Sequence, residues 1–392
     1  MPLPSFCPNP RCTYHTAPLT GGRWYVRFGS YSTHAHGTVR RFRCRGCGHT
    51  MSEQTESLHY FAKRRLPLCA VWESLVGGSP LREIARRYRV SPMAVQSGIL
   101  RLGRQAMAAQ LALLEALSPR ARIVFDGLRS CVTAQDYPCD ITTAVDPRGE
   151  TILSMVHSIS CRGGTLRPAQ RERLKRKLAA WRPEKGSVKG AISLLVNEIG
   201  SYLYPSIPYP ALIDTDEAPL YRRVIETDRA MRHWALAGLV CHIRTPSTEP
   251  RTVDNRLFPV NYVDRLLRHR IKEHTRETIA CGRHTTMQMH RAWVFAWDHN
   301  ARRPRRVKRP AGGCHAERAG IGEECLQRLA REFFTRRIRL HPGQWVPSSM
   351  MQVWLAALPT PPLRWRCGQQ GTTVRVPAYA RRDLAAAFQQ AA

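Results

Sequence analysis

Two pairs of cysteines near the start of the chain have the spacing of metal ligands. Cys7 and Cys12 enclose Pro-Asn-Pro-Arg, and Cys44 and Cys47 enclose Arg-Gly, so each pair is expected in a tight turn. Two such pairs, separated by a β-rich and Arg-rich stretch, can close a tetrahedral site with four sulfur ligands. Four thiolates leave no open position on the metal. We therefore expect a structural Zn²⁺ in a zinc-ribbon arrangement.

The other cysteines and two histidines refine this expectation. His15 and His49 are possible substitute ligands, although a surface position is the simpler interpretation of each. Most of the 13 cysteines lie singly, which does not resemble a disulfide framework. With no basic-then-apolar signal segment at the N-terminus, this usage fits a reducing cytosol, and we expect a cytoplasmic, nucleoid-associated protein.

A second set of candidate ligands is acidic. Asp126 and Asp216 each end an apolar run that is typical of a strand. If the two strands are neighbours, the two carboxylates lie at one edge of a sheet, where they could hold a pair of Mg²⁺ or Mn²⁺ ions. Asp214 lies on the same strand face as Asp216, so the spacing leaves either residue as the ligand.

A third acid is expected on a helix at about residues 262–280. The apolar stripe of that helix places Asp264 beside the buried face. Glu277 lies further from the stripe on its other side, and Glu273 is expected to be in solvent. We therefore rank Asp264 first, Glu277 second and Glu273 last. An alternative needs no metal: Asn261 could cap the helix, with Asp264 as the acid of a capping box.

The charge of the chain indicates its partner. The 392 residues contain 61 lysines and arginines against 29 aspartates and glutamates, a formal net charge of +32. A self-repelling excess of this size favours a polyanion, and nucleic acid is the default. No apolar stretch is long enough to cross a membrane, so we expect no membrane association.

Two regions are candidates for contacting DNA. Ser79-Pro80 and Ser91-Pro92 each open a short amphipathic helix, and Arg89-Val90 supplies the turn of a helix-turn-helix. The proline-broken basic run after residue 301 is interpreted as a linker that contacts phosphates. The expected DNA-binding residues are Arg82, Arg86, Arg87, Gln96, Ser97, Arg101 and Arg104 in the first region, and Arg302, Arg303, Arg305 and Arg306 in the second.

The predicted elements suggest a multidomain α+β protein. After residue 119, three strands are followed by a helix, a strand, a helix, a strand and a helix, which is the order of an RNase H-like α/β domain. We divide the chain into a zinc ribbon (1–58), a helix-turn-helix region (59–118), the RNase H-like domain (119–300) and a basic C-terminal extension (301–392). The Ala/Leu-rich run at 105–117 is expected to be a linker helix or a dimer contact.

This order of domains resembles the DDE-type transposases of bacterial insertion sequences, with the insertion-sequence-one family or a close relative as the nearest group. Phe125-Asp126-Gly127 resembles the first-acid segment, and Thr215-Asp216-Glu217 with Tyr221 resembles the second, which favours Asp216 over Asp214. The segment from Asn255 to Asp264 and the Arg-Glu-Thr-Ile sequence at 276–279 resemble the third-acid helix. At the third-acid position the family has Glu, and three residues later it has Asn. At these two positions this chain has Asn261 and Asp264.

The resemblance implies a function and partners. Such transposases bind the terminal inverted repeats of their element, cut its ends and join the 3′ ends to target DNA by two-metal phosphoryl transfer. The implied partner is double-stranded DNA, held by a homo-oligomer. Two alternatives stay open: a catalytically inactive DNA-binding protein or regulator derived from a transposase, and a plain DNA nuclease.

Overall fold

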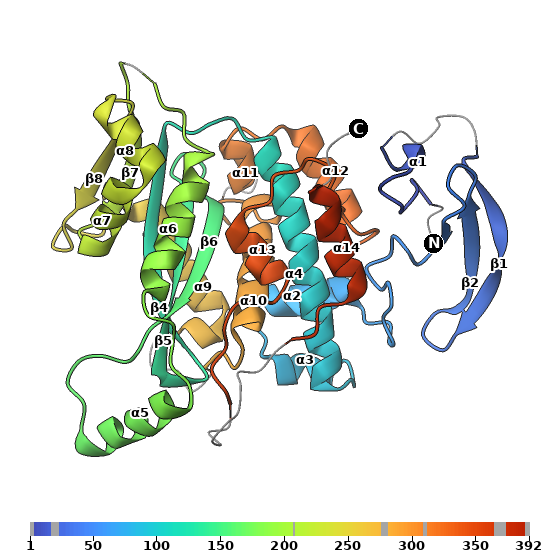
Figure 1. The fold of residues 1–392 in the computed structure, drawn as a ribbon, viewed down its shortest axis with the longest axis horizontal. Helices are drawn as coiled ribbons and strands as arrows, with labels where there is room; N and C mark the ends of the chain where they lie inside the picture. Colours follow the sequence, from blue (N-terminus) through green and yellow to red (C-terminus); the bar gives the residue numbers. More distant parts are fainter. Residues whose placement is uncertain are drawn as a thin grey trace.

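The computed structural model describes residues 4–16, 23–206, 208–275, 281–308, 312–363 and 374–388. The N-terminal part, residues 4–58, is a small separate unit at one end of the molecule (Figure 1). Its antiparallel sheet has the order β1-β2-β3, and a small core of its own contains three of the four paired cysteines, Trp24 and Phe42. The elements are α1 (Thr13–Thr16), β1 (Tyr25–Thr33), β2 (Gly37–Cys44) and β3 (Thr50–Ser52). We call this unit the cysteine module.

A five-stranded sheet forms the centre of the rest of the chain. Its strand order is β6-β5-β4-β7-β8. The first three strands pair antiparallel, with β5 and β6 joined by a turn at 147–150, whereas β7 pairs parallel with both β4 and β8. The strands are β4 (Arg122–Val132), β5 (Ala134–Asp146), β6 (Thr151–Ile159), β7 (Ala211–Asp216) and β8 (Val240–Thr245).

Strand alternation divides the core into two layers. Ile123 and Phe125 of β4 belong to one apolar cluster, and Val124 and Leu128 belong to the other, because successive side chains point to opposite faces. The first face is covered by α6 (Ser187–Gly200) and α7 (Pro219–Thr227), with α8 (Arg229–Leu236) beside them; the second is covered by α9 (Phe258–Arg270) and α10 (Thr285–Trp297).

The predicted helix pair is present, and its second helix is much longer than expected. The helices are α2 (Leu68–Val76), α3 (Leu81–Arg87) and α4 (Pro92–Glu115). The Ser91 side chain caps α4 by accepting a hydrogen bond from the Ala94 N–H, and Arg89 turns the chain with φ +49°. Helix α4 continues through the run at 105–117, so that run is neither a linker nor an exposed dimer contact.

Helix α4 is packed at the centre of the molecule. It lies against α10 so closely that a Cβ at Gly103 would be 2.2 Å from the His290 ring. One apolar cluster runs from Leu58 through α4 and the sheet to Phe333. The predicted boundary at residue 118 therefore does not separate two cores.

The C-terminal region wraps around this body. The Gln105 side chain donates hydrogen bonds to the carbonyl groups of Phe333 and Arg336. The helix expected at 262–280 ends at Arg270 and is followed by the 3-10 turn η1 (Lys272–His274). The further elements are α5 (Pro168–Ala180), the π-helix η2 (Asp298–Arg302), α11 (His315–Arg318), α12 (Glu323–Phe333), α13 (Ser348–Trp354) and α14 (Ala378–Ala387). Among the helices that the structure describes, none is long and apolar enough to cross a membrane.

Candidate metal centres and nucleic-acid interface

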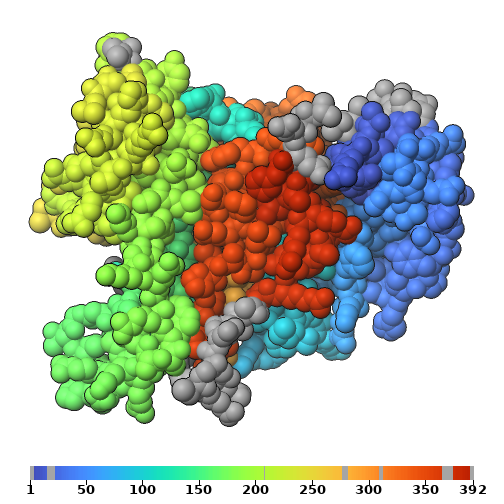
Figure 2. Space-filling view, in the orientation of Figure 1, coloured from blue at the N-terminus to red at the C-terminus, as the bar shows by residue number. Residues whose placement is uncertain are grey.

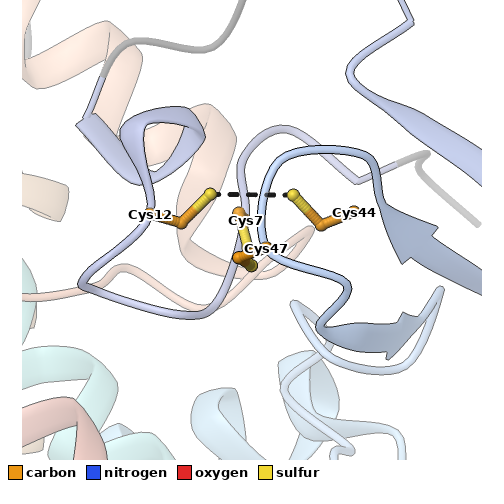
Figure 3. A group of neighbouring side chains, drawn as sticks. All are labelled: Cys7, Cys12, Cys44 and Cys47. Atoms are coloured by element: carbon orange, nitrogen blue, oxygen red, sulfur yellow. Dashed lines mark hydrogen bonds between the residues drawn. The ribbon is translucent and has the colours of Figure 1, made fainter.

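The four paired cysteines converge on one point (Figure 3). The Sγ atoms of Cys7, Cys12, Cys44 and Cys47 all lie within 4.8 Å of one another. The Sγ atoms of Cys7 and Cys47 are 3.6 Å apart, and those of Cys12 and Cys44 are 3.7 Å apart. A tetrahedron with zinc–sulfur bonds of about 2.3 Å has sulfur–sulfur edges of about 3.8 Å. The predicted cluster is present, and its spacing suits a structural metal such as zinc.

Short-range backbone contacts hold the cysteines in place. The Cys7 N–H donates to the Tyr14 carbonyl over 2.8 Å, and the Gly48 N–H donates back to the Cys44 carbonyl over 3.1 Å. Gly48 has φ +70°, a conformation that favours glycine. A Cβ at Gly46 would lie 2.9 Å from the Tyr14 ring. The two glycines are therefore needed for the second cysteine turn, as the sequence indicates.

The electrostatics of the cluster differ between its thiols. Burial raises the pKa of the Cys7 thiol. Burial also opposes ionisation of Cys47, but hydrogen bonds from Asn9 and the His49 backbone lower the pKa of that thiol to about 7. The His15 ring points its Nδ1 at the Cys7 carbonyl, 2.7 Å away. Neither His15 nor His49 belongs to the cluster of ligand atoms among the described residues.

The two acids that the sequence places at strand ends lie on one face of the large sheet. Asp216 is the last residue of β7 as predicted, whereas Asp126 lies inside β4, which continues to Val132. The parallel register pairs Val124 of β4 with Asp214 of β7. Continued by two residues, it sets Asp126 opposite Asp216. Both positions share the strand face of Val124, against which α9 packs. We call Asp126, Asp216 and the Asp264 side chain of α9 the acid face.

Asp264 reaches this face from helix α9, which packs against it. It is 9% exposed, and its Oδ1 atom is buried with no hydrogen-bond partner among the described residues. Burial and the carboxylate of Asp126 raise the pKa of Asp264 well above its ordinary value. Burial and the carboxylate of Asp216 raise the pKa of Asp126 to about 6. Asp126 is therefore the carboxylate that links the three acids, because the charge of Asp216 acts on it and its own charge acts on Asp264.

The capping alternative for Asp264 is wrong. Helix α9 begins at Phe258 with Leu257 as its N-cap, so Asn261 lies inside the first turn and does not cap the helix. Pro259 at the second helical position fits this start, because the first amide groups of a helix have no partner within it. A buried carboxylate in the second turn needs another explanation.

Of the two other candidates for the third acid, Glu273 is described by the structure and Glu277 is not. Glu273 was expected in solvent, but it is 8% exposed and its carboxylate accepts a hydrogen bond of 3.1 Å from Arg291. The expectation fails because α9 ends at Arg270, so the helical wheel does not extend to residue 273. Glu277 and the sequence at 276–279 lie outside the described residues.

Asp214 has a structural role. It is fully buried, and its two carboxylate oxygens accept hydrogen bonds from Arg122 and Arg256. Two guanidinium partners neutralise this carboxylate, whereas Asp216 has the Ala218 N–H as its partner, at 2.9 Å. The preference for Asp216 over Asp214 as the open carboxylate agrees with these contacts.

Two further residues interact electrostatically with the acids: Tyr221, which the sequence named only as part of the segment around Asp216, and Arg251, which it did not single out. The Tyr221 ring packs on Phe125, and a Cβ at Gly127 would lie 3.0 Å from the Tyr221 hydroxyl, so the glycine makes room for it. Burial and the charges of Asp126 and Asp216 raise the pKa of Tyr221. The exposed Arg251 has the opposite effect on the acids: its positive charge lowers the pKa values of Asp126 and Asp264. Nothing in the local sequence distinguishes Arg251 from the many other arginines.

The predicted DNA-contacting residues of α3 and α4 divide into two groups. Arg82, Arg86, Arg87 and Ser97 are exposed and Gln96 is half-buried. Arg86 is paired with Glu83, and Arg87 donates a long hydrogen bond of 3.4 Å to the Ser74 hydroxyl.

Arg101 and Arg104 do not face solvent as expected. Arg101 donates hydrogen bonds to the carbonyl groups of Leu58 and Tyr60, and Arg104 is buried and donates to the Trp354 carbonyl. Both belong to the part of α4 that the C-terminal region covers. The two arginines make structural contacts inside the protein, so the prediction that they contact DNA is wrong.

The basic run after residue 301 is also more structured than a linker. Arg303 pairs with Asp298, and Arg305 makes two hydrogen bonds to the Glu150 carboxylate, at 2.7 and 3.1 Å. Arg302 is exposed and stacks over the Phe334 ring, whereas Arg306 is exposed with no ion pair among the described residues. Two of the four predicted phosphate ligands are thus already neutralised by acids of the same chain.

Comparison with models of known protein families gives no match, and comparison with curated proteins gives no similar sequence.

Proposed function

We propose that this protein is a DNA transposase of the DDE type, acting on the ends of an insertion sequence by metal-dependent phosphoryl transfer. The observation that carries the proposal is the acid face: Asp126, Asp216 and Asp264 come from three separate elements and meet on one side of the sheet. The strand order, with three antiparallel strands followed by two parallel ones, supports an RNase H-like fold for the body.

The acid face is suited to divalent cations. Its donors are carboxylate oxygens, the ligands that Mg²⁺ and Mn²⁺ prefer, and the buried Oδ1 of Asp264 has no hydrogen-bond partner among the described residues. In the described part of the chain, the cysteines alone have ligand atoms that all lie within 4.8 Å of one another. The ligand atoms of a two-metal site do not need to lie this close together. When two ions are about 4 Å apart and each has ligands at about 2.1 Å, ligand atoms on opposite sides of the pair are about 8 Å apart.

Each acidic residue then has a distinct part. Asp126 and Asp216, opposite each other on neighbouring strands, would hold the metals from the sheet, and Asp264 would hold one from α9. When bound, the ions supply Lewis-acid stabilisation of the attacking and leaving oxygens. Arg251 adds a positive charge at the rim, where a DNA phosphate has to approach. Asp214 remains with its two arginines and contributes to the position of β7.

DNA recognition is assigned to the N-terminal half. Helices α3 and α4 with their tight turn support a helix-turn-helix in which the first turns of α4, carrying Gln96 and Ser97, enter a major groove. The exposed Arg82, Arg86 and Arg87 are available to neighbouring phosphates. The cysteine module is interpreted as a zinc ribbon. From the family resemblance we expect a homo-oligomer on DNA in the bacterial cytoplasm.

The decisive experiment uses the DNA that flanks the gene. Duplexes carrying any short inverted repeats found there are incubated with the full chain, Mg²⁺ or Mn²⁺ and a target plasmid. Cleavage at the repeat ends followed by joining to the plasmid supports a transposase. Cleavage without joined product would indicate a nuclease, and binding without cleavage would indicate an inactive DNA-binding derivative.

A further inference from the structure

A basic arm projects from the end of the sheet, and the function proposed above does not yet use it. Helix α5 and the segments on either side of it, residues 161–189, form a separate lobe beside the sheet (Figures 1 and 2). Of the residues of α5, all of which the structure describes, Leu174 alone is buried. We call residues 161–189 the α5 arm.

Some of the cations of the α5 arm attach it to the sheet by pairing with a buried acid. The Asp136 carboxylate, whose residue is 1% exposed, accepts hydrogen bonds from Lys177 at 2.6 Å and from Arg173 at 3.1 Å, and Arg162 lies within 3.5 Å of it. The Tyr137 hydroxyl lies 2.8 Å from the Trp181 carbonyl, and the two rings pack edge to face. Cations on the inner side of the arm therefore serve as anchors.

The outer side of the arm keeps its charge unpaired. The exposed cations without an ion pair among the described residues are Arg167, Arg171, Lys175, Arg176, Arg182, Lys185 and Lys189. The acids of the arm are Glu172 and Glu184, and neither forms an ion pair in the described structure. Arg171 and Lys175 are four residues apart, a like-charge spacing that weakens a helix unless an anion lies against it.

The arm is attached near the end of β4, the strand that carries Asp126 of the acid face. Leu178 of α5 and Trp181, which follows the last residue of the helix, pack against the apolar cluster of Val132, Tyr137, Cys139 and Ile159. Val132 is the last residue of β4. Asp126 lies six residues earlier on the same strand. At roughly 3.3 Å per residue that separation is about 20 Å, which equals the axial rise of about six base pairs of a DNA duplex. A duplex with one phosphodiester at the acid face can thus reach the arm.

We propose that the α5 arm is a binding surface for double-stranded DNA, in which Arg171, Lys175 and Arg176 contact the phosphates about half a helical turn from the bond at the acid face. The inference rests on the proposed action on duplex DNA. It adds a contact that is independent of base sequence, because long flexible cations on an exposed helix neutralise phosphates and read no base edges.

The test measures binding of the full chain to a 30-base-pair duplex of arbitrary sequence over a series of salt concentrations. The arm variant carries Arg171→Gln, Lys175→Gln and Arg176→Gln. The matched control carries Arg318→Gln, Arg328→Gln and Arg331→Gln, which removes the same charge from exposed sites on α11 and α12. Circular dichroism and thermal unfolding verify that both variants stay folded.

We expect the arm variant to lose affinity roughly 10-fold or more at 0.1 M salt, and the slope of log K against log salt to become shallower by about 2 to 3. The control variant should retain most of its affinity. Equal losses in both variants, or wild-type affinity in the arm variant, would overturn the arm as a binding surface. Preferential binding of duplex RNA through the same residues would also overturn it.

Failure of the arm and failure of the proposed function give different results. If Asp126→Asn abolishes end cleavage while the arm variant binds like wild type, the transposase proposal stands and the arm inference falls. If wild type binds duplex DNA through the arm but neither cleaves nor joins it, the arm inference stands and the catalytic proposal falls.

Discussion

The cysteine module and the acid face are two candidate metal-ligand sets that are assembled in opposite ways. The cysteines come from two short turns, one before β1 and one between β2 and β3, and their sulfur atoms lie at the spacing of a tetrahedral site. The three acids come from β4, β7 and α9, and their approach depends on the register of the sheet and the docking of a helix. Turn geometry determines the first set, and tertiary packing determines the second.

The two regions also differ in what a metal does for stability. The cysteine module has a small core that consists largely of the cysteines themselves and a few aromatic residues. Units of this size usually need a metal to fold. The acid face instead borders a large apolar cluster that includes α9, α10 and three strands. Loss of metal should therefore unfold the first region and leave the second folded.

The largest expected effect tests that difference at the cysteine module. Cys44→Ser removes one ligand, so the full chain should lose its one bound zinc and the module should become sensitive to protease, because structural zinc sites supply the folding free energy of such units. Metal analysis and limited proteolysis measure both effects. The exposed Cys161→Ser is the control. A wild-type chain that contains no zinc would refute the prediction, as would a Cys44→Ser chain that keeps it.

At the acid face we expect loss of activity without loss of fold. Asp126→Asn or Asp216→Asn should reduce metal-dependent end cleavage at least about 1,000-fold, since several kcal/mol of transition-state stabilisation come from the metals. Binding to DNA ends and thermal stability should change little. The comparison variant Asp214→Asn should do the reverse, lowering thermal stability because it removes the partner of Arg122 and Arg256. If Asp214→Asn is stable but inactive and Asp216→Asn is active, Asp214 would be the metal ligand and Asp216 would not.

Variants of Asp264 and Glu273 compare a proposed metal ligand with a carboxylate that has a structural role. Asp264→Asn should abolish cleavage while the chain stays folded, because its carboxylate borders Asp126. Glu273→Gln should keep cleavage and lose about 3 kcal/mol of stability, since it leaves Arg291 without its ion pair. Cleavage assays and denaturant unfolding separate the two. If both variants remain active, the third ligand lies elsewhere, and Glu277→Gln is the next variant to assay.

The smallest effect is expected in the basic run after residue 301. Arg306→Gln with Lys308→Gln should weaken binding to all DNA sequences alike and make the salt slope shallower by about 2. Arg303→Gln should leave that slope nearly unchanged and lower thermal stability, because Arg303 pairs with Asp298 inside the protein. A change in base-sequence preference for the first variant would contradict a phosphate-contacting role.

Several structural features could be predicted from local patterns alone. The two cysteine turns, the Ser91 cap, the hairpin around residues 146–149 and the order of strands and helices all depend on residues close together in the chain. The burial of Asp264 was also predictable, because the apolar stripe of its helix lies within a few turns. Such features are determined by short-range sterics, hydrogen bonding and periodic burial.

Other features required the tertiary structure. The sequence of α4 shows an amphipathic helix, but it does not show that α10 and the C-terminal region cover its second half and take up Arg101 and Arg104. Likewise, Arg303 and Arg305 resemble every other exposed arginine until Asp298 and Glu150 are placed beside them.

The sequence by itself thus determined the ligand types, the elements that carry them and the excess of positive charge. Tertiary structure alone decided which charges are free. Asp214 is neutralised by two arginines and Asp216 is not, although they lie two residues apart on one strand. The physical reason is that an ion pair depends on the distance between side chains from remote segments, and packing of those segments sets that distance.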